Sequence, residues 1–236
     1  MSAIQQRIIT AAAAGALVLT ANKRLSRHLI AAYDTQLQAA GETVWATPQI
    51  ISFDGWLHRC LADLGESWRL LEGFPALRLW EQLIEKQSAN SELELLQLAA
   101  TARKVQEAYQ WSVSYDCNAD DFPLTEDQQV FQHWQKAYRQ QCQQQRWLDR
   151  AELPALVFAA MRNGQLALPT EVLLVGFDQS TPELEGLRRV VEQAGGQIEE
   201  LQAEPAAQAQ IGSFACPDPQ REVELAARSR AARSGG

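Results

Sequence analysis

A cluster of cations follows a short apolar run near the amino terminus. Residues 17–20 read L-V-L-T, the composition of a buried strand, and four polar residues come soon after: Asn22, Lys23, Arg24 and Arg27. Apolar residues then recur at helical spacing, so the cations fall on the first turns of a helix. Backbone amides and cations at a helix start suit a phosphate group. The alternative is that these side chains only solvate an exposed helix face.

A second block with candidate nucleic-acid contacts spans residues 51–61, which read I-S-F-D-G-W-L-H-R-C-L. Asp54 is a plausible amino-terminal cap for a helix that ends near Gly65. The candidate contacts are Ser52, Trp56, His58 and Arg59. An aromatic ring on which a base stacks contributes roughly 1–3 kcal/mol. The alternatives are a core position for Trp56 and an ordinary surface position for His58.

The order and spacing of these two blocks resemble two DNA-contacting motifs of superfamily 1, UvrD-like helicases. The first motif, T-x-T-N-K-x-A, is matched in its core by Thr20–Lys23. The second, T-F-H-S-x-x-x-R-x-L, is matched by Ser52, Phe53, Arg59 and Leu61, whereas D-G replaces H-S. The resemblance implies contact with single-stranded DNA at both blocks.

A third block, residues 173–182, reads L-L-V-G-F-D-Q-S-T-P and is similar to the Walker B segment V-D-E-F-Q-D-T of the same helicases. Gln179 stays in register with that segment. Gly176 and Phe177 stand where two acids would hold magnesium and orient water, and Asp178 falls one place off. Residues 147–153, W-L-D-R-A-E-L, resemble the l-D-f-x-D-L segment that precedes Walker B.

The ATP-binding loop that should precede the first block is absent. A P-loop needs G-x-x-x-x-G-K-[ST] so that its amides and lysine hold the phosphates. Residues 10–16 read T-A-A-A-A-G-A, with one glycine and no lysine. Positioning and charge stabilisation supply nearly all the catalysis in phosphoryl transfer. We therefore predict that this chain does not hydrolyse ATP and that it has no catalytic residue, no metal ligand and no cofactor. The alternative is an active ATPase with an unusual nucleotide-binding loop.

Taken together, the blocks resemble the amino-terminal helicase-like region of AddB/RecC-type proteins. The nearest group is the bacterial DNA repair proteins in which an inactivated helicase is joined to a PD-(D/E)XK exonuclease. That resemblance implies a role in DNA repair and recombination, with a nuclease domain beyond Gly236 and a helicase or nuclease subunit as partner. Residues 214–224 also resemble the strand and helix that lead into the second helicase domain.

Charge is distributed unevenly along the 236 residues. The net charge is −8; residues 1–60 hold five cations and three acids, which gives +2 and leaves −10 for the rest. An acidic protein is a poor duplex binder, whereas a local basic face suits one strand. The four cysteines lie far apart, which disfavours a zinc site and favours the cytoplasm. We expect no membrane contact; a signal-peptide core at Ile8–Ala21 is the alternative.

Apolar periodicity predicts an α/β fold in which a helical segment interrupts a parallel sheet. Strands are expected at 16–20, within 44–51, and at 171–176, 198–201 and 209–215. The intervening residues 68–163 are expected to be almost entirely helical, with a capping box at residues 125–128. A final helix is expected from about residue 221.

The predicted domains are a helicase-like core of the P-loop type, residues 1–65 plus 166–236, and an inserted helical subdomain, residues 66–165. Two functions fit this organisation. The first is a non-catalytic module that binds or guides single-stranded DNA for a downstream nuclease. The second is a protein-interaction scaffold, in which the tryptophans of the helical part contact a partner: Trp68, Trp80, Trp111, Trp134 and Trp147.

Overall fold

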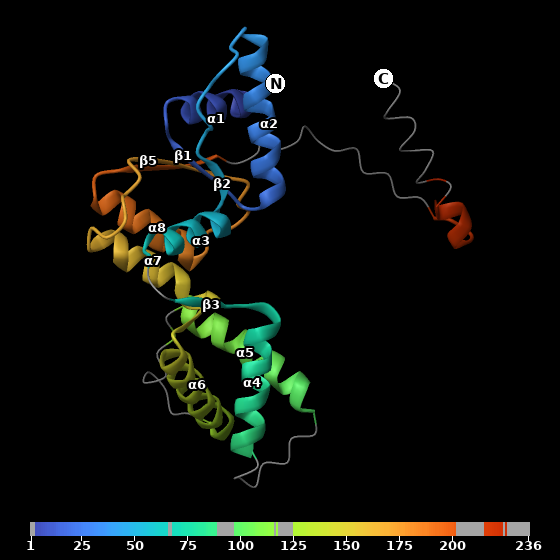
Figure 1. Cartoon of the computed structure of the whole chain (residues 1–236). Coiled ribbons are helices and arrows are strands. Elements are labelled where there is room, and N and C mark those ends of the chain that lie inside the picture. The colour runs from blue at the N-terminus through green and yellow to red at the C-terminus, as the bar shows by residue number, and fades with distance from the viewer. Residues whose placement is uncertain are drawn as a thin grey trace. The chain divides into compact units, whose positions relative to one another are not determined.

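The computed structural model describes residues 3–65, 68–88, 97–115, 117, 125–201, 215–223 and 225. Among these residues, a parallel sheet of four strands has the order β2-β1-β5-β6 (Figure 1). The strands are β1 (Leu17–Thr20), β2 (Ile50–Ser52), β5 (Glu171–Val175) and β6 (Gln197–Leu201). The two central strands are direct neighbours, and Leu17 lies opposite Val172. The expected α/β fold with a parallel sheet is confirmed.

Two helices cover one face of the sheet. Successive side chains of a strand point to opposite faces, so every second residue of β1 and β5 faces these helices. Val18 and Leu173 point to this face and pack against α1 (Ala3–Ala13) and α2 (Lys23–Ala39). In Figure 1 both helices lie on the same side of β1 and β5. The buried part of α2 includes Leu29 and Tyr33, which are one turn apart.

The opposite face of the sheet is covered by α3 (Phe53–Asp63), α7 (Leu153–Arg162) and α8 (Pro182–Gln193). Leu19 and Leu174 project to this side and are almost completely buried. Since both faces are covered, β5 needs an uninterrupted apolar sequence, and V-L-L-V supplies it.

Polar side chains fix where the sheet-covering helices begin. The side chain of Asn22 accepts a hydrogen bond from the amide of Leu25 at 3.0 Å, which starts α2. For α3 the cap is Ser52, whose hydroxyl accepts from the amide of Gly55, and not the expected Asp54. The strand β2 therefore runs directly into its helix. Of the strand expected within residues 44–51, only Ile50 and Ile51 are extended, in β2.

Three long helices form a second core: α4 (Gly73–Ser88), α5 (Leu98–Ser114) and α6 (Glu126–Gln145). Trp80 stacks on Tyr138 with ring centroids 3.9 Å apart, and Tyr109 contacts both rings. The capping box at Thr125 is present and starts α6 as expected. We call these three helices the helical block.

Two short strands interrupt the region that we expected to be entirely helical. β3 (Arg69–Leu71) pairs in parallel with β4 (Trp147–Asp149), and the 3-10 helix η2 (Arg150–Glu152) follows. Three-residue strands are too short to show a period of two, so helical periodicity on either side concealed them. A left-handed residue, Arg146 with φ of 54°, ends α6 and turns the chain into β4.

Contacts divide the chain into two compact units, Met1–Gln202 and Ala203–Gly236. The predicted boundaries at residues 65 and 166 remain predictions, although α7 lies within the predicted insertion and packs in the core of the sheet. In the second unit, residues 219–223 are helical, and Asp218 accepts from the amide of Arg221 at 2.8 Å. The expected strand at 209–215 lies outside the described residues, apart from Ala215.

Candidate nucleic-acid interface

The carboxyl ends of β1 and β5 form the switch point of the sheet. From β1 the chain passes through α2 on one face to β2, and from β5 it passes through α8 on the other face to β6. Open α/β sheets bind ligands in the crevice outside such a point. Here the amide of Ala21 donates to the carbonyl of Val175 at 3.1 Å and holds the two chain exits together. Residues 20–27 and 176–181 therefore border the candidate site.

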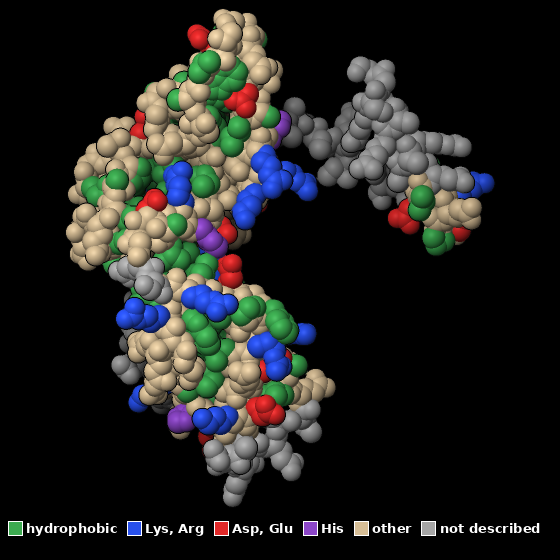
Figure 2. Space-filling model, in the orientation of Figure 1, with side chains coloured by type: hydrophobic (Ala, Val, Ile, Leu, Met, Phe, Trp, Pro, Cys, Tyr) green, Lys and Arg blue, Asp and Glu red, His purple; other side chains and the backbone are tan. Residues whose placement is uncertain are grey.

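Three exposed cations occupy one side of α2 at this edge. Arg27 lies three residues after Arg24 and four after Lys23, so the three cations fall on the side of α2 opposite Leu29 and Tyr33, which are buried. Figure 2 shows Lys and Arg side chains gathered over the first turns of α2. Within the described residues, none of the ion pairs involves these three cations.

The position of these cations is electrostatically unfavourable for the helix. The amino end of a helix carries partial positive charge and favours acids, yet the first turn of α2 has none. Lys23 and Arg24 instead add two positive charges there. An anion bound at this end would relieve that repulsion. Of the backbone amides at the start of α2, the side chain of Asn22 accepts a hydrogen bond from that of Leu25.

The third block turns sharply away from β5 at Gly176. Gly176 has φ of 76°, and a Cβ at this position would lie 2.6 Å from Leu25 Cδ2. Phe177 packs edge-on against Phe53 with centroids 6.4 Å apart, while Asp178 and Gln179 are exposed. Asp178 is thus the one acid of this turn, and the described residues contain no group of three or more ligands suited to a metal.

In the second block, the Trp56 and Ser52 side chains are buried and have structural roles. Trp56 is only 3% exposed, because it lies in the core with Leu57 and stacks on Phe53. This is the core position that the sequence left open as the alternative to a stacking surface for a base. The Ser52 hydroxyl is buried and caps α3. Neither side chain is free to contact a nucleic acid.

Arg59 lies at the other end of the sheet. It lines a cavity of about 570 Å³ together with Gly15 and Leu17, which mark the amino end of β1. Lys23 follows the carboxyl end of the same strand. The two motifs thus do not form one continuous DNA-contacting edge, because α3 runs away from that edge before it reaches Arg59.

Asp54 faces η2, and His58 lies near Glu72, between β3 and α4. Arg150 in η2 donates from Nε to Asp54 Oδ1 at 2.7 Å, and its Nη2 lies 2.6 Å from the same oxygen. This ion pair gives Asp54 a structural role. Sequence reasoning missed Arg150 as its partner, because the two residues are 96 positions apart and no local pattern links them.

The segment before the third block connects the helical block to the sheet. Asp149 is buried, accepts hydrogen bonds from Tyr138 Oη at 2.5 Å and the amide of Ala151 at 2.8 Å, and has its pKa raised by burial. Glu152 accepts from Tyr109 Oη at 2.6 Å. Burial is the main cause that raises the pKa of Tyr109 and Tyr138, and the neighbouring carboxylates of Glu152 and Asp149 raise it further. The acids that resemble a helicase segment therefore act here as structural anchors.

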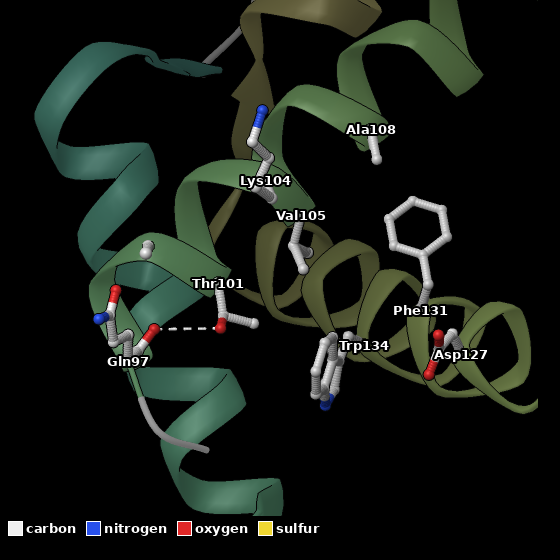
Figure 3. A pocket seen from close by; sticks show the side chains of 9 residues that line it. Gln97, Thr101, Lys104, Val105, Ala108, Asp127, Phe131 and Trp134 are labelled. Carbon is white, nitrogen blue, oxygen red and sulfur yellow. Dashed lines mark hydrogen bonds between the residues drawn. The ribbon is translucent and has the colours of Figure 1, made fainter.

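The helical block has its own surface features. Of the tryptophans proposed for partner contact, Trp80 and Trp134 are buried, whereas Trp111 is 57% exposed and stacks on Tyr115. A groove of about 620 Å³ lies between α5 and α6. Figure 3 shows Val105 and Phe131 pointing into this groove. Its lining is mainly apolar.

No protein-family model matches this sequence, and no curated protein is significantly similar to it. Among the described helices, none is long and apolar enough to cross a membrane.

Proposed function

We propose that this chain is a non-catalytic helicase-like module that binds single-stranded DNA weakly through the start of α2. It would act within a bacterial DNA repair exonuclease and guide a strand toward a nuclease domain. The observation that carries the proposal is the set of three exposed cations, Lys23, Arg24 and Arg27, at the positive end of a helix. They border the switch point where α/β sheets bind their ligands.

The helicase origin of the fold is part of the same proposal. The motifs occur in helicase order, the strands that carry the first and third motifs are neighbours in one parallel sheet, and a helical block separates them in sequence. This organisation supports a P-loop-like core with an inserted subdomain. Loss of the phosphate loop and of both Walker B acids supports the absence of ATPase activity.

A titration of a fluorescent oligonucleotide tests the DNA-binding site. The variant Lys23→Ala/Arg24→Ala/Arg27→Ala should weaken binding and reduce the salt dependence, since each phosphate contact with a single strand contributes about 0.7 to the slope of log K against log salt. Arg59→Ala is the matched control, because Arg59 lies at the amino end of the sheet. Unchanged affinity and slope in the triple variant would remove α2 from the site.

The second candidate function is a protein-interaction scaffold without direct DNA binding. The apolar groove between α5 and α6 and the exposed pair of Trp111 and Tyr115 favour it. The same titration separates the two functions: no binding at high micromolar protein and low salt supports the scaffold. Equilibrium dialysis with ATP and magnesium tests the remaining rival, an active ATPase, which requires a tight magnesium-dependent complex.

A further inference from the structure

The helical block leaves one side of α5 and α6 uncovered. Both helices pack against α4. The groove of about 620 Å³ between them is lined by α5, with its cap Gln97, and by α6, and none of its described lining residues comes from α4. A four-helix bundle holds a further helix at such a position. Within the described part of the chain this position holds no helix, so it is open to another molecule.

A largely exposed stripe of α5 continues from this groove to the end of the helix. Its members are separated alternately by four and three residues: Gln97, Thr101, Lys104, Ala108, Trp111 and Tyr115. The first four of them line the groove. This is the spacing of a coiled-coil seam, which places all six on one side of the helix. Ala102 and Tyr109, which are buried in the core of the helical block, lie on another side. The α5 stripe is therefore suited to contact a second helical surface.

The α5 stripe combines a ridge with one wall of a groove. At its carboxyl end, Trp111 and Tyr115 stack with ring centroids 5.5 Å apart, and more than half of each residue is exposed. Toward the amino end of α5, Ala100 and Ala108 present only methyl groups to the groove, and Phe131 of α6 points into it (Figure 3). Because the ridge and the groove follow each other along one helix, a second copy turned end for end brings its ridge to the groove of the first.

The charges of the groove are complementary to those of a second copy. The charged side chains of its lining are Lys104 on α5 and Asp127 on α6. Lys104 pairs with Glu107, but both side chains are exposed, so that pair contributes little. Asp127 takes part in none of the ion pairs among the described residues. A two-fold axis repeats every contact in both directions, so an axis midway between Lys104 and Asp127 pairs each cation with the acid of the other copy.

We propose that this face of the helical block binds a second copy of the chain about a two-fold axis. The ridge of Trp111 and Tyr115 of each copy lies in the groove of the other, and Lys104 of each copy faces Asp127 of the other. The occupant of the groove is then the chain itself and not the partner protein of the scaffold function. The dimer does not depend on DNA binding, since the cations proposed to contact DNA lie on α2.

Sedimentation equilibrium of the whole chain tests the dimer. As the concentration rises from low to high micromolar, the mean mass should increase from that of one chain toward that of two. Trp111→Ala/Tyr115→Ala should raise the dissociation constant roughly tenfold or more, because aromatic anchors contribute most to an interface. Phe74→Ala is the matched control, since Phe74 is 71% exposed at the start of α4 and does not line the groove. A native chain that stays monomeric at high micromolar concentration would overturn the proposal and leave the groove to another protein.

Exchange of the two groove charges tests the two-fold arrangement. Lys104→Asp places acids opposite each other across the interface, and Asp127→Lys places cations there, so each variant alone should associate more weakly than the native chain. An equimolar mixture of the two variants should recover association. The mixed dimer pairs the introduced acid of one variant with the introduced cation of the other and keeps one native pair. Circular dichroism verifies that both variants are folded. No recovery in the mixture, or native-like association of either variant alone, would overturn the arrangement.

Discussion

Leu25 packs over Gly176 at the switch point of the sheet. Gly176 leaves β5 with φ of 76°, and a Cβ added there would lie 2.6 Å from Leu25 Cδ2. The glycine therefore serves both a backbone turn and a close approach of α2. Under the proposed resemblance to a helicase Walker B segment, this position would hold an acid that binds magnesium; here the side chain of Leu25 takes up that space. The turn and the contact with Leu25 thus leave no room for a side chain at residue 176.

Replacing Gly176 by alanine should destabilise the fold by about 1–3 kcal/mol, since a left-handed backbone strains any residue with a Cβ. Gly164→Ala is the matched control, because Gly164 has φ of 72° and nothing within 4 Å of an added Cβ. Urea unfolding of both variants separates the two effects: the excess cost at Gly176 measures the contact with Leu25. Equal costs would mean that Leu25 moves aside freely.

The sequence predicted the parts of the fold that depend on long periodic signals. The buried strand at Val172–Val175 and the capping box at Thr125 are both present, because burial on two faces and reciprocal capping leave clear local patterns. The short strand Arg69–Leu71 and the pairing of Asp54 with Arg150 could not be predicted, because they depend on residues distant in sequence.

The candidate site was predicted in part. The cations after β1 are exposed as expected, since helical spacing already separated them from the apolar face of α2. The sequence left two positions open for Trp56, because an aromatic residue on a helix has the same local signature in a core as on a binding surface, and the structure places it in the core. Arg59 was grouped with Ser52 by motif spacing alone, although seven residues of helix carry it to the other end of the sheet.

Charge reversal at the start of α2 should stabilise the protein and weaken DNA binding together. Lys23→Glu places an acid in the first turn, where it interacts favourably with the helix dipole, and should add about 0.3–1 kcal/mol to the free energy of unfolding. The same change repels phosphate. Chemical denaturation and oligonucleotide titration measure the two effects separately.

The matched control for that charge reversal is Arg27→Glu, which lies beyond the first turn of α2. It should weaken DNA binding similarly while changing stability little, since the dipole effect falls off within one turn. A loss of stability in Lys23→Glu would contradict the unfavourable placement of the native cation, and unchanged DNA affinity in both variants would contradict the binding site.

Thiol reactivity should distinguish the buried cysteines from the exposed one. Burial raises the pKa of Cys60 to about 11 and that of Cys142 to about 12, so almost no reactive thiolate exists at neutral pH. Cys117 is exposed. A colorimetric disulfide reagent should therefore modify Cys117 rapidly in the folded chain, and Cys60 and Cys142 only after unfolding. Cys216 is partly exposed as well, so the double variant Cys117→Ser/Cys216→Ser should abolish the fast phase. Fast modification of Cys142 would contradict the buried core of the helical block.

Removing the hydroxyl of Tyr138 should destabilise the junction in a pH-dependent manner. Burial raises the pKa of Asp149, and the hydrogen bond from Tyr138 opposes that rise. In Tyr138→Phe the buried carboxylate loses this donor, which should cost about 1–3 kcal/mol at neutral pH. Urea unfolding at pH 5 and pH 7.5 measures the free energy.

The sign of the pH effect follows from the raised pKa of Asp149. An acid whose folded-state pKa lies above its unfolded value lowers stability as pH rises through that interval, and Tyr138→Phe widens the interval. The cost of the substitution should therefore be smaller at pH 5 than at pH 7.5. Tyr109→Phe is the control, because Glu152 is partly exposed and retains Arg139 at 3.5 Å, so its cost should be smaller and nearly independent of pH. An equal cost of Tyr138→Phe at both pH values would show that Asp149 does not titrate in this range.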